Sequence, residues 1–422
     1  MAKRPKPLTE DPITFEPVNV DDLDASEAVD QLIEQAAAMQ ASDLCFHPNE
    51  NNCEVVVRHN GLMKRLALLT LDQGHRLVSY IKSHCGMNLA ERRKPQDARW
   101  KMTLPNDSVI DLRASLLPSL YGEDLAIRLL LRDTQLRDIE HVGMSAKQHQ
   151  ELEGLLNTPS GLILVTGPNG SGKTTTLYAC LKYLVNGERK INTIEDPVEY
   201  ALAGIRQTPV NERAGCTFSE VLRSVLRQAT DVIMVGEIRD AETAQTAVRA
   251  ANSGHLVFAT LHAPTAVGAV QSMLGLGVNN HFLSTALLGV ISQRLLRQLC
   301  DRTKIPVDLS MAPHTFDEIK HLVSPNERLS MYSPAPDPDG PSSDCDEMGY
   351  NGRVGCFEIL RLDRKMRDLI SKNADSRTLS EHAQKSGMLN FRQAALIKVA
   401  EGVTTIEEVM RVVSGEDLDL ED

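Results

Sequence analysis

The central part of the chain alternates short apolar runs with segments in which apolar residues recur every three or four positions. The apolar runs, which predict buried strands, are 162–166, 190–195, 232–235 and 256–260. The periodic segments predict helices that start at Lys173 and that cover 218–228 and 241–251. Strands that alternate with helices form mostly parallel sheets with helices on both faces. Residues 138–299 are therefore predicted to form an α/β domain.

The segment before this region mixes strand-like and helix-like patterns and predicts an α+β domain over residues 26–132. Apolar residues spaced as in amphipathic helices predict helices over 26–40 and 71–85. Strand-like runs occur at 43–46, 53–58, 62–66, 99–103, 109–116 and 124–131. Residues 132–136 would be a connecting hinge, and residues 1–25, with their prolines and acidic side chains, a flexible leader.

The patterns change again after residue 299. Residues 300–355 show no regular period, and their turn-rich stretch 333–344 predicts an insertion made of loops. Residues 356–414 predict a small helical domain. Its expected helices cover about 363–373, 377–387, 389–401 and 404–413. Residues 415–422 are an acidic tail.

Composition narrows the class of protein. The 422 residues contain 45 Lys and Arg against 57 Asp and Glu, a net charge of −12 that argues against broad capture of nucleic acid or anionic lipid. No run of about 18 apolar residues and no signal-peptide pattern is present, so we expect a cytosolic protein. Eight scattered cysteines fit a reducing compartment.

A phosphate-binding loop follows the first predicted central strand. The stretch GPNGSGKT over 167–174 fits G-x-x-x-x-G-K-[ST], and its backbone N–H groups at a helix N-terminus would hold a polyphosphate. The expected nucleotide-binding residues are Gly167, Asn169, Gly170, Ser171, Gly172, Lys173, Thr174 and Thr175. Lys173 would reach the β and γ phosphates, and the Thr174 hydroxyl would hold Mg²⁺. ATP and Mg²⁺ are therefore the expected cofactors.

Carboxylates follow two other predicted strands. Hydrolysis needs Mg²⁺ held by an acid at a strand end, a group that orients the attacking water, and cations that neutralise transition-state charge. Residues 231–237 form an apolar strand that ends in Glu237, and residues 193–199 place three carboxylates beyond another strand. An α/β sheet has its ligand crevice at these carboxyl ends.

These motifs together resemble the type II secretion and type IV pilus assembly ATPase family, whose members are ring-forming motors. The resemblance covers about 41–413 and rests on motifs that occur in the family's order. Beyond the phosphate loop they are ASDL at 41–44, TIEDPVE at 193–199, FSEVLRSVLR at 218–227, VGEIRDAET at 235–243 and SGHLVFATLH at 253–262. The resemblance implies a RecA-like P-loop NTPase core with an N-terminal α+β domain and a small helical C-terminal domain.

The resemblance also implies roles for individual residues. Glu237 would bind Mg²⁺ through water, and Glu199 would be the general base that orients the attacking water. Two histidines would sense the γ-phosphate, and four arginines from both domains would act as arginine fingers. These residues are His255, His262, Arg113, Arg128, Arg223 and Arg227. For a histidine alone, a buried structural role is the alternative, and for Arg223 and Arg227 it is a solvated surface pair.

The expected partners also come from the resemblance. They are five further copies of the chain in a homohexamer, a polytopic inner-membrane platform protein and a membrane-bound recruiter. The leader is shorter than the extra N-terminal domain through which many members dock, so docking would be reduced or differently arranged. The protein would then lie in the cytoplasm, at the inner face of the cytoplasmic membrane.

The insertion departs from the family in its metal ligands. Many members carry two C-x-x-C pairs there, whereas this chain keeps only Cys300, with Thr303 in the second place, and Cys345, with Ser342 in the first. A closed zinc site needs four Cys or His ligands. We therefore expect no structural zinc. A site rebuilt with the nearby histidines, acidic residues or Cys356 is the alternative.

Three other functions remain to be weighed against an assembly or secretion motor. A pilus retraction motor would end in an Ala-Ile-Arg-Asn-Leu motif, which this chain lacks. A nucleic-acid translocase or ring helicase would need a basic, aromatic-bearing stripe, but aromatic residues are only 4% of the chain. A non-hydrolysing scaffold would not need every catalytic position filled. The sequence thus favours an ATPase that drives pseudopilus or pilus assembly, with no nucleic acid as partner.

Overall fold

The computed structural model describes residues 18–20, 23–131, 138–308, 314–322, 329–337, 345–346 and 348–413. The chain divides into two compact units, Met1–Gln135 and Leu136–Asp422, which are described separately below. Most of the predicted leader, the hinge at 132–136, Ser342 and the acidic tail lie outside the described residues.

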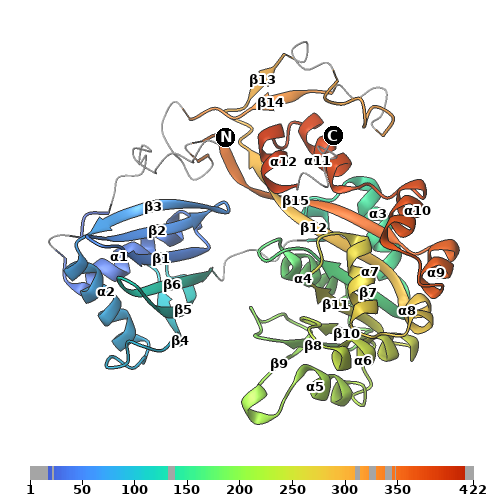
Figure 1. Cartoon of the computed structure of the whole chain (residues 1–422), viewed down its shortest axis with the longest axis horizontal. Helices are drawn as coiled ribbons and strands as arrows, with labels where there is room; N and C mark the ends of the chain where they lie inside the picture. The colour runs from blue at the N-terminus through green and yellow to red at the C-terminus, as the bar shows by residue number, and fades with distance from the viewer. Residues whose placement is uncertain are drawn as a thin grey trace. The chain divides into compact units, whose positions relative to one another are not determined.

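In its described residues, the N-terminal unit forms a six-stranded antiparallel sheet and two helices (Figure 1), with the strand order β3-β2-β1-β6-β5-β4. The strands are β1 (Asp43–Pro48), β2 (Cys53–His59), β3 (Leu62–Leu69), β4 (Gln96–Thr103), β5 (Val109–Ser119) and β6 (Gly122–Leu131). The helices are α1 (Ala25–Ala38) and α2 (Leu71–His84), and each begins with a capping box. In β5 the residues up to Leu116 alternate between buried and more accessible positions, as expected for a sheet with one covered face.

The C-terminal unit is built on a seven-stranded sheet in the order β15-β12-β7-β11-β10-β8-β9. Its strands are β7 (Gly161–Thr166), β8 (Ile191–Glu195), β9 (Arg206–Pro209), β10 (Val232–Val235), β11 (Leu256–Leu261), β12 (Leu287–Leu299) and β15 (Tyr350–Arg361). Every neighbouring pair is parallel except β12 and β15.

Helices cover both faces of this sheet (Figure 1), because alternate side chains of its buried strands point to opposite sides. In β7, Leu162 and Leu164 join a cluster with α6, α7 and α8, whereas Ile163 and Val165 join a second cluster with α3 and α4. These helices and α5 are α3 (Ala146–Leu156), α4 (Lys173–Leu184), α5 (Phe218–Val225), α6 (Ala241–Asn252), α7 (Ala266–Gly275) and α8 (Asn280–Ala286). The predicted α/β class with a parallel sheet is confirmed.

Two long strands at one edge of the sheet are not predicted from the sequence. β12 and β15 pair antiparallel from Gly289↔Arg361 to Leu299↔Tyr350, and they carry the chain into and out of the segment predicted as an insertion. Within that segment β13 (Ile305–Val307) pairs with β14 (Met331–Ser333). The C-terminal helices follow β15 close to their predicted positions. They are α9 (Arg364–Ser371), α10 (Ser376–Lys385), α11 (Phe391–Ala400) and α12 (Ile406–Val412).

A buried ion pair attaches the last helix to β12. Glu408 of α12 is fully buried and accepts hydrogen bonds from the backbone N–H and the Nε of Arg297, both at 2.9 Å. Arg411 bonds the same carboxylate. Although burial alone would raise the pKa of Glu408, the hydrogen bonds from Arg411 and Arg297 lower it below its ordinary value.

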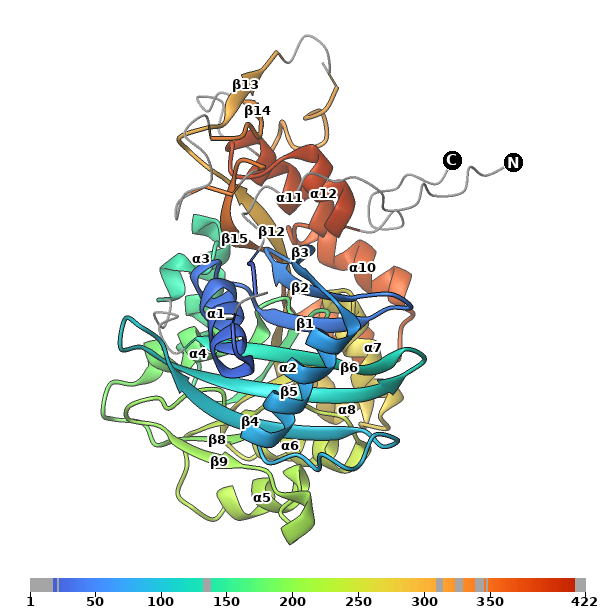
Figure 2. The same ribbon diagram turned by 90° about the vertical axis from the view of Figure 1, so that its left-hand side faces the viewer.

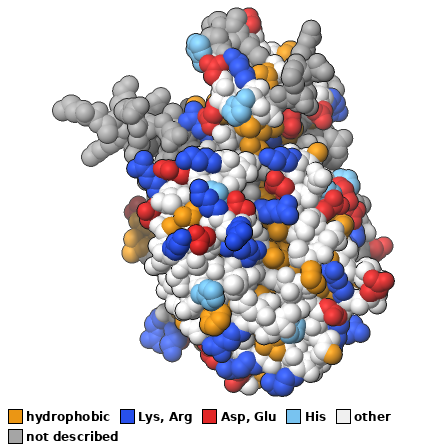
Figure 3. Space-filling model, turned by 90° about the vertical axis from the view of Figure 1, so that its right-hand side faces the viewer, with side chains coloured by type: hydrophobic (Ala, Val, Ile, Leu, Met, Phe, Trp, Pro, Cys, Tyr) orange, Lys and Arg blue, Asp and Glu red, His pale blue; other side chains and the backbone are white. Residues whose placement is uncertain are grey.

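In the described residues, none of the helices combines the length and hydropathy needed to cross a bilayer. On the face shown in Figure 3, acidic and basic side chains are intermingled over the surface. The covered face of the N-terminal sheet, with α1 and α2 lying across the strands, is seen in Figure 2.

Candidate nucleotide site

The phosphate loop joins the buried strand β7 to α4, and glycines are required at two of its positions. Gly167 has a φ of +142°, and a Cβ there would lie 2.4 Å from the carbonyl oxygen of Gln293 in β12. Gly172, the N-cap of α4, has a φ of +88°. Because both backbone conformations are rare for residues with a Cβ, the sequence folds this loop only with glycine at these places.

The N-terminus of α4 has the chemistry of an anion site. Its N-cap Gly172 brings no side-chain cap, so the first N–H groups of the helix receive no capping hydrogen bond from that residue. Nζ of Lys173 donates hydrogen bonds to the carbonyl oxygens of Gly167, at 2.8 Å, and of Pro168, at 3.0 Å. Burial lowers the pKa of Lys173, and Glu237 opposes that shift. A polyphosphate fits this set of donors.

β12 supports the loop through Gln293, a residue outside every sequence motif described above. The side chain of Gln293 is 1% exposed, and its Nε2 donates a 2.6 Å hydrogen bond to the carbonyl oxygen of Ser171. The sequence gives no signal of this contact, because other polar residues of β12 flank Gln293, and only the pairing of β12 with β7 places it beside the loop. Gln293 therefore positions the loop and is not predicted to touch the nucleotide.

Glu237 lies just beyond β10, within a charged cluster. Its Oε1 is 2.7 Å from Nε2 of His262, and its Oε2 accepts a 2.6 Å hydrogen bond from Nε of Arg239. Although burial alone would raise the pKa of Glu237, Arg239 and His262 lower it below the ordinary value. The carboxylate is therefore ionised at neutral pH, as a ligand of Mg²⁺ or of its waters must be.

Glu199 lies four residues beyond β8, in a loop anchored by a different carboxylate. Glu195, at the end of β8, is 3% exposed and accepts hydrogen bonds from three neutral donors. They are Tyr178 on α4, Thr193 at 2.5 Å and Gln207 at 3.1 Å. Glu195 is thus fixed to α4, the helix that follows the phosphate loop. Of the three carboxylates predicted here, this one has a positioning role.

The two predicted histidines stand at opposite ends of β11. His262 follows the strand at the carboxyl edge of the sheet and contacts Glu237. His255 precedes the strand, its carbonyl oxygen accepts the N–H of Gly161 at the start of β7, and its Nδ1 lies 3.0 Å from the carbonyl oxygen of Ala250. The two histidines are seven residues apart along an extended strand, a separation of about 23 Å. Within one chain the structure therefore groups only His262 with Glu237.

Arg223 and Arg227 lie on and just after α5, beside β8 and the edge strand β9. Arg223 pairs with Glu242 at 2.6 Å, and Arg227 donates to the carbonyl oxygen of Arg223 at 2.9 Å. Both line a cavity of about 770 Å³ beside α5, together with Lys190 and Arg206. This cavity is rich in cations. The structure does not group these arginines with the phosphate loop of the same chain.

Arg113 and Arg128 lie in the N-terminal unit, directly opposite each other on β5 and β6. Arg99 of β4 pairs with Arg113 on the other side, and Arg128 in turn faces Asp43 of β1. Nε of Arg128 donates a 3.2 Å hydrogen bond to Oδ1 of Asp43. We call Arg99, Arg113, Arg128 and Asp43 the arginine row. Like charges directly opposite each other on a sheet are destabilising, and an anion bound at this face would offset the repulsion among the three arginines.

The two cysteines of the insertion lie together. The thiols of Cys300 and Cys345 are hydrogen-bonded to each other, and Oγ1 of Thr303 is 3.4 Å from Sγ of Cys345. The chain therefore places the remnants of both ligand pairs at one point. Over the part of the chain that the structure describes, no group of three or more His, Cys, Asp or Glu residues is arranged to hold a metal. The absence of zinc stays a prediction, since Ser342 is not described.

The sequence of this chain is similar to those of known secretion and pilus assembly proteins. The family model for type II/IV secretion system proteins matches residues 19–411. The chain belongs to the type II/IV secretion system protein family. It is 38% identical over 392 residues to the type II secretion system ATPase E of Vibrio cholerae, covering 93% of this chain and 76% of that protein. It is 37% identical to the type IV pilus assembly ATPase PilB of Thermus thermophilus, over 93% of this chain and 43% of that protein.

Two solved structures share the fold of this chain. The pilus retraction motor PilT with bound ADP aligns with a TM-score of 0.61 and 26% identity, covering 93% of this chain and 98% of that one. The ATPase DotB of Legionella pneumophila aligns with a TM-score of 0.66 and 18% identity, over 94% and 97%, which supports the fold alone. The resemblance inferred from the sequence motifs is confirmed.

Proposed function

We propose that the chain is a magnesium-dependent ATPase that powers the assembly of a type II secretion pseudopilus or a type IV pilus. The observation that carries the proposal is Lys173 at the N-terminus of α4, with Glu237 close enough to affect the pKa of its ammonium group. Relatives named as secretion or pilus assembly ATPases, at 37% to 39% identity, support an assembly motor over the retraction motor PilT at 26%.

The residues of the site divide the work of hydrolysis. The N–H groups of the loop and Lys173 would bind the phosphates, and the Thr174 hydroxyl and Glu237 would hold Mg²⁺, which stabilises charge on the transferring phosphoryl group. Glu199 would accept the proton of the attacking water. His262 is bonded to Glu237 and would register any displacement of that carboxylate. Glu195 keeps the loop of Glu199 attached to α4.

The arginines would complete the site only in an assembled ring. Arg223 and Arg227 lie away from the phosphate loop of their own chain, and the arginine row belongs to the other unit. Such placement suits groups that act on a neighbouring subunit, so we propose a homohexamer in which these cations reach nucleotide when the ring closes. We also propose that His255 relays the loss of the γ-phosphate. Its carbonyl oxygen accepts a hydrogen bond from Gly161 at the start of β7, the strand that leads into the phosphate loop.

The proposed place of work is the cytoplasmic face of the inner membrane. Family members act with secretion machinery, and by analogy this chain would bind a polytopic platform protein and a membrane-bound recruiter. The nucleic-acid translocase is disfavoured by the composition, with a net charge of −12 and 4% aromatic residues.

Phosphate release from ATP by the full chain, with and without Mg²⁺, tests the activity. Lys173→Ala should lower hydrolysis at least about 100-fold, as expected when a charge that stabilises the transition state is removed. Lys182→Ala changes a half-exposed lysine on the same helix, paired with Asp138, and should leave the rate unchanged. Glu237→Gln should retain binding of ATP and lose turnover. Hydrolysis at the wild-type rate in Lys173→Ala would refute the assignment.

A further inference from the structure

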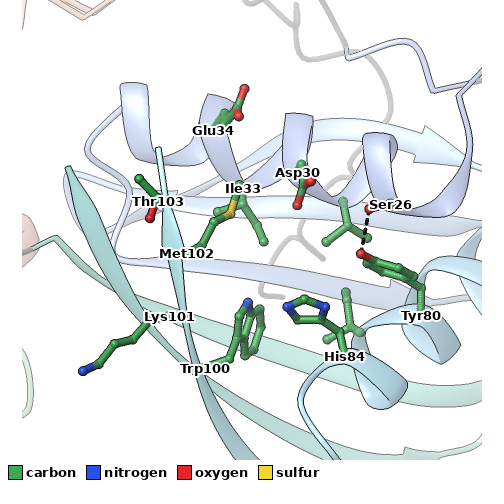
Figure 4. A pocket seen from close by; sticks show the side chains of 12 residues that line it. Ser26, Asp30, Ile33, Glu34, Tyr80, His84, Trp100, Lys101, Met102 and Thr103 are labelled. Carbon is green, nitrogen blue, oxygen red and sulfur yellow. Dashed lines mark hydrogen bonds between the residues drawn. The ribbon is translucent and has the colours of Figure 1, made fainter. Parts of the chain in front are cut away.

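The N-terminal unit contains a cavity that belongs to none of the predicted catalytic groups. It has a volume of about 380 Å³ and lies between α1, α2 and β4 (Figure 4). Its size falls at the lower end of the range for small-ligand pockets, about 300 to 1,000 Å³. All three elements contribute to its lining, which includes Ser26, Asp30, Tyr80, His84 and Trp100.

Three aromatic rings form one wall of this cavity. Tyr80 and His84, on successive turns of α2, are stacked with centroids 5.8 Å apart, and His84 meets Trp100 of β4 edge-on at 6.4 Å. A 2.7 Å hydrogen bond between Tyr80 and Ser26 of α1 closes one end. Aromatic faces attract cations, and tryptophan does so most strongly. The wall thus favours a ligand with positive charge.

A carboxylate faces these rings from the other side. In Figure 4 the carboxylate of Asp30 points from α1 toward His84 and Trp100, whereas Lys101 points away from them. Burial raises the pKa of Asp30, with His84 opposing the shift. Among the residues described, no lysine or arginine forms an ion pair with Asp30 or with Glu34, which also lines the cavity.

The helix that carries these acids has no basic residue to offset them. The sequence of α1, ASEAVDQLIEQAAA, contains three carboxylates and neither lysine nor arginine. Asp30 and Glu34 are four residues apart, a spacing at which like charges destabilise a helix. A cation between Asp30 and the aromatic wall would relieve this repulsion and be held by both sides of the cavity.

We propose that this cavity binds the side chain of an arginine presented by a partner polypeptide. The planar guanidinium can stack on Trp100 while its N–H groups donate to Asp30, which an ammonium group does less well. A polypeptide is favoured over a free cation because the cavity adjoins β4, the edge strand of the sheet. Among the strands that the structure describes, β4 pairs only with β5, so a partner backbone can lie against its outer edge.

The only tryptophan of the chain is Trp100, so its fluorescence reports on this cavity alone. We would titrate the full chain with N-acetyl-arginine methylamide, and with the neutral citrulline analogue as a matched control. The arginine probe should give a saturable change in emission and the citrulline probe none. Asp30→Asn should weaken the arginine probe about fivefold, the size expected for a partly exposed ion pair.

Two further variants keep the result interpretable. Asp97→Asn removes a carboxylate from the same strand as Trp100, but on the opposite face of the sheet. This variant should leave probe binding unchanged. Equal responses to both probes, or unchanged affinity in Asp30→Asn, would overturn the proposal. If instead the full-length variant Lys3→Gln, Arg4→Gln, Lys6→Gln shifts the emission without probe, the occupant is the chain's own leader and the partner proposal is wrong.

Discussion

Asp43 in β1 accepts a hydrogen bond from Arg128 in β6, its direct partner across the antiparallel pair, with Oδ1 and Nε 3.2 Å apart. The side chain of Asp43 is 18% exposed and that of Arg128 is 64% exposed, so the acid is held in the sheet while most of the arginine faces water. Asp43 therefore holds the inner edge of Arg128 and leaves the outer edge of the guanidinium for an anion.

This pairing gives a graded prediction for catalysis. Arg128→Ala should lower the turnover number by about tenfold or more with a smaller effect on nucleotide affinity, since arginine fingers contribute on the order of 10³ to 10⁵ and four candidates share that work here. Asp43→Asn should cost at most about fivefold, because an exposed ion pair contributes no more than about 1 kcal/mol. Steady-state hydrolysis measures both. A loss in Asp43→Asn as large as in Arg128→Ala would contradict a positioning role.

The ring itself can be tested through the N-terminal unit. If hydrolysis needs arginines from a neighbouring subunit, activity per chain should rise with protein concentration as the hexamer forms. Sedimentation and phosphate release measured on the same samples should then change together. A chain starting at Asp138 that hydrolyses ATP as fast as the full chain would show that the arginine row is not needed.

Glu199 is predicted to act on the attacking water and not on nucleotide binding. Glu199→Gln should bind ATP with nearly unchanged affinity and lose turnover by about 100-fold or more, as expected for loss of a general base. Glu188→Gln, which alters a carboxylate hydrogen-bonded to Asn186 on the surface, is the control. Single-turnover hydrolysis at the wild-type rate in Glu199→Gln would remove this residue from the role of base.

The buried pair of Glu408 and Arg297 predicts a change in stability. Glu408→Gln should destabilise the C-terminal unit by about 3 kcal/mol, because breaking a buried ion pair leaves a charge without its partner. Glu407→Gln, at the exposed neighbouring position, should change stability by less than about 0.5 kcal/mol. Urea unfolding followed by circular dichroism gives both values. Equal midpoints for the two variants would contradict the prediction.

The pH dependence of that effect follows from the lowered pKa of Glu408. A carboxyl group whose folded pKa lies below its ordinary value of 4.5 adds stability that is complete above 4.5. This stability is lost as the pH falls through the lower, folded value. The difference between wild type and Glu408→Gln should therefore be constant from about pH 6 to 8 and shrink in acid. A difference that grows below pH 4.5 would have the wrong sign.

Metal content tests the prediction for the insertion. Protein purified without added zinc or chelator should contain well under one zinc per chain, because two thiols and a threonine hydroxyl do not make a closed zinc site. Elemental analysis by mass spectrometry is the measurement. About one zinc per chain would mean that residues outside the described structure complete a site with Cys300 and Cys345.

The parts of the fold that local pattern controls could be predicted from the sequence. The alternation of strands and helices, the glycines of the phosphate loop and the helix at 26–40 all depend on neighbours close in the chain, and the structure has them nearly where expected. β12 could not be predicted because its polar residues are buried by distant partners. Arg294 stacks on Phe391 and Arg297 on Tyr350, with 4.5 and 4.0 Å to the ring centroids.

In the nucleotide site, too, contacts between residues distant in the sequence could not be predicted. Lys173 and Glu237 follow from motif spacing, and the structure brings them near each other. No spacing rule indicates Gln293, and the motif that contains Glu195 does not show that this carboxylate bonds Tyr178 of α4, because both contacts depend on how the elements pack. His255 and His262 belong to one sequence motif, but the motif spans the whole of β11. The extended strand therefore places the two histidines at opposite ends of it.

β12 contacts the phosphate loop at Gln293 and, four residues later, holds α12 through Arg297. An extended strand changes little in length when pulled, and these two points are about 13 Å apart along it. A displacement of the loop on nucleotide binding would therefore reach α12, the last helix among the described residues, along one continuous strand. β12 therefore connects the phosphate loop to α12, and the surface of α12 is where a movement coupled to nucleotide binding should be sought.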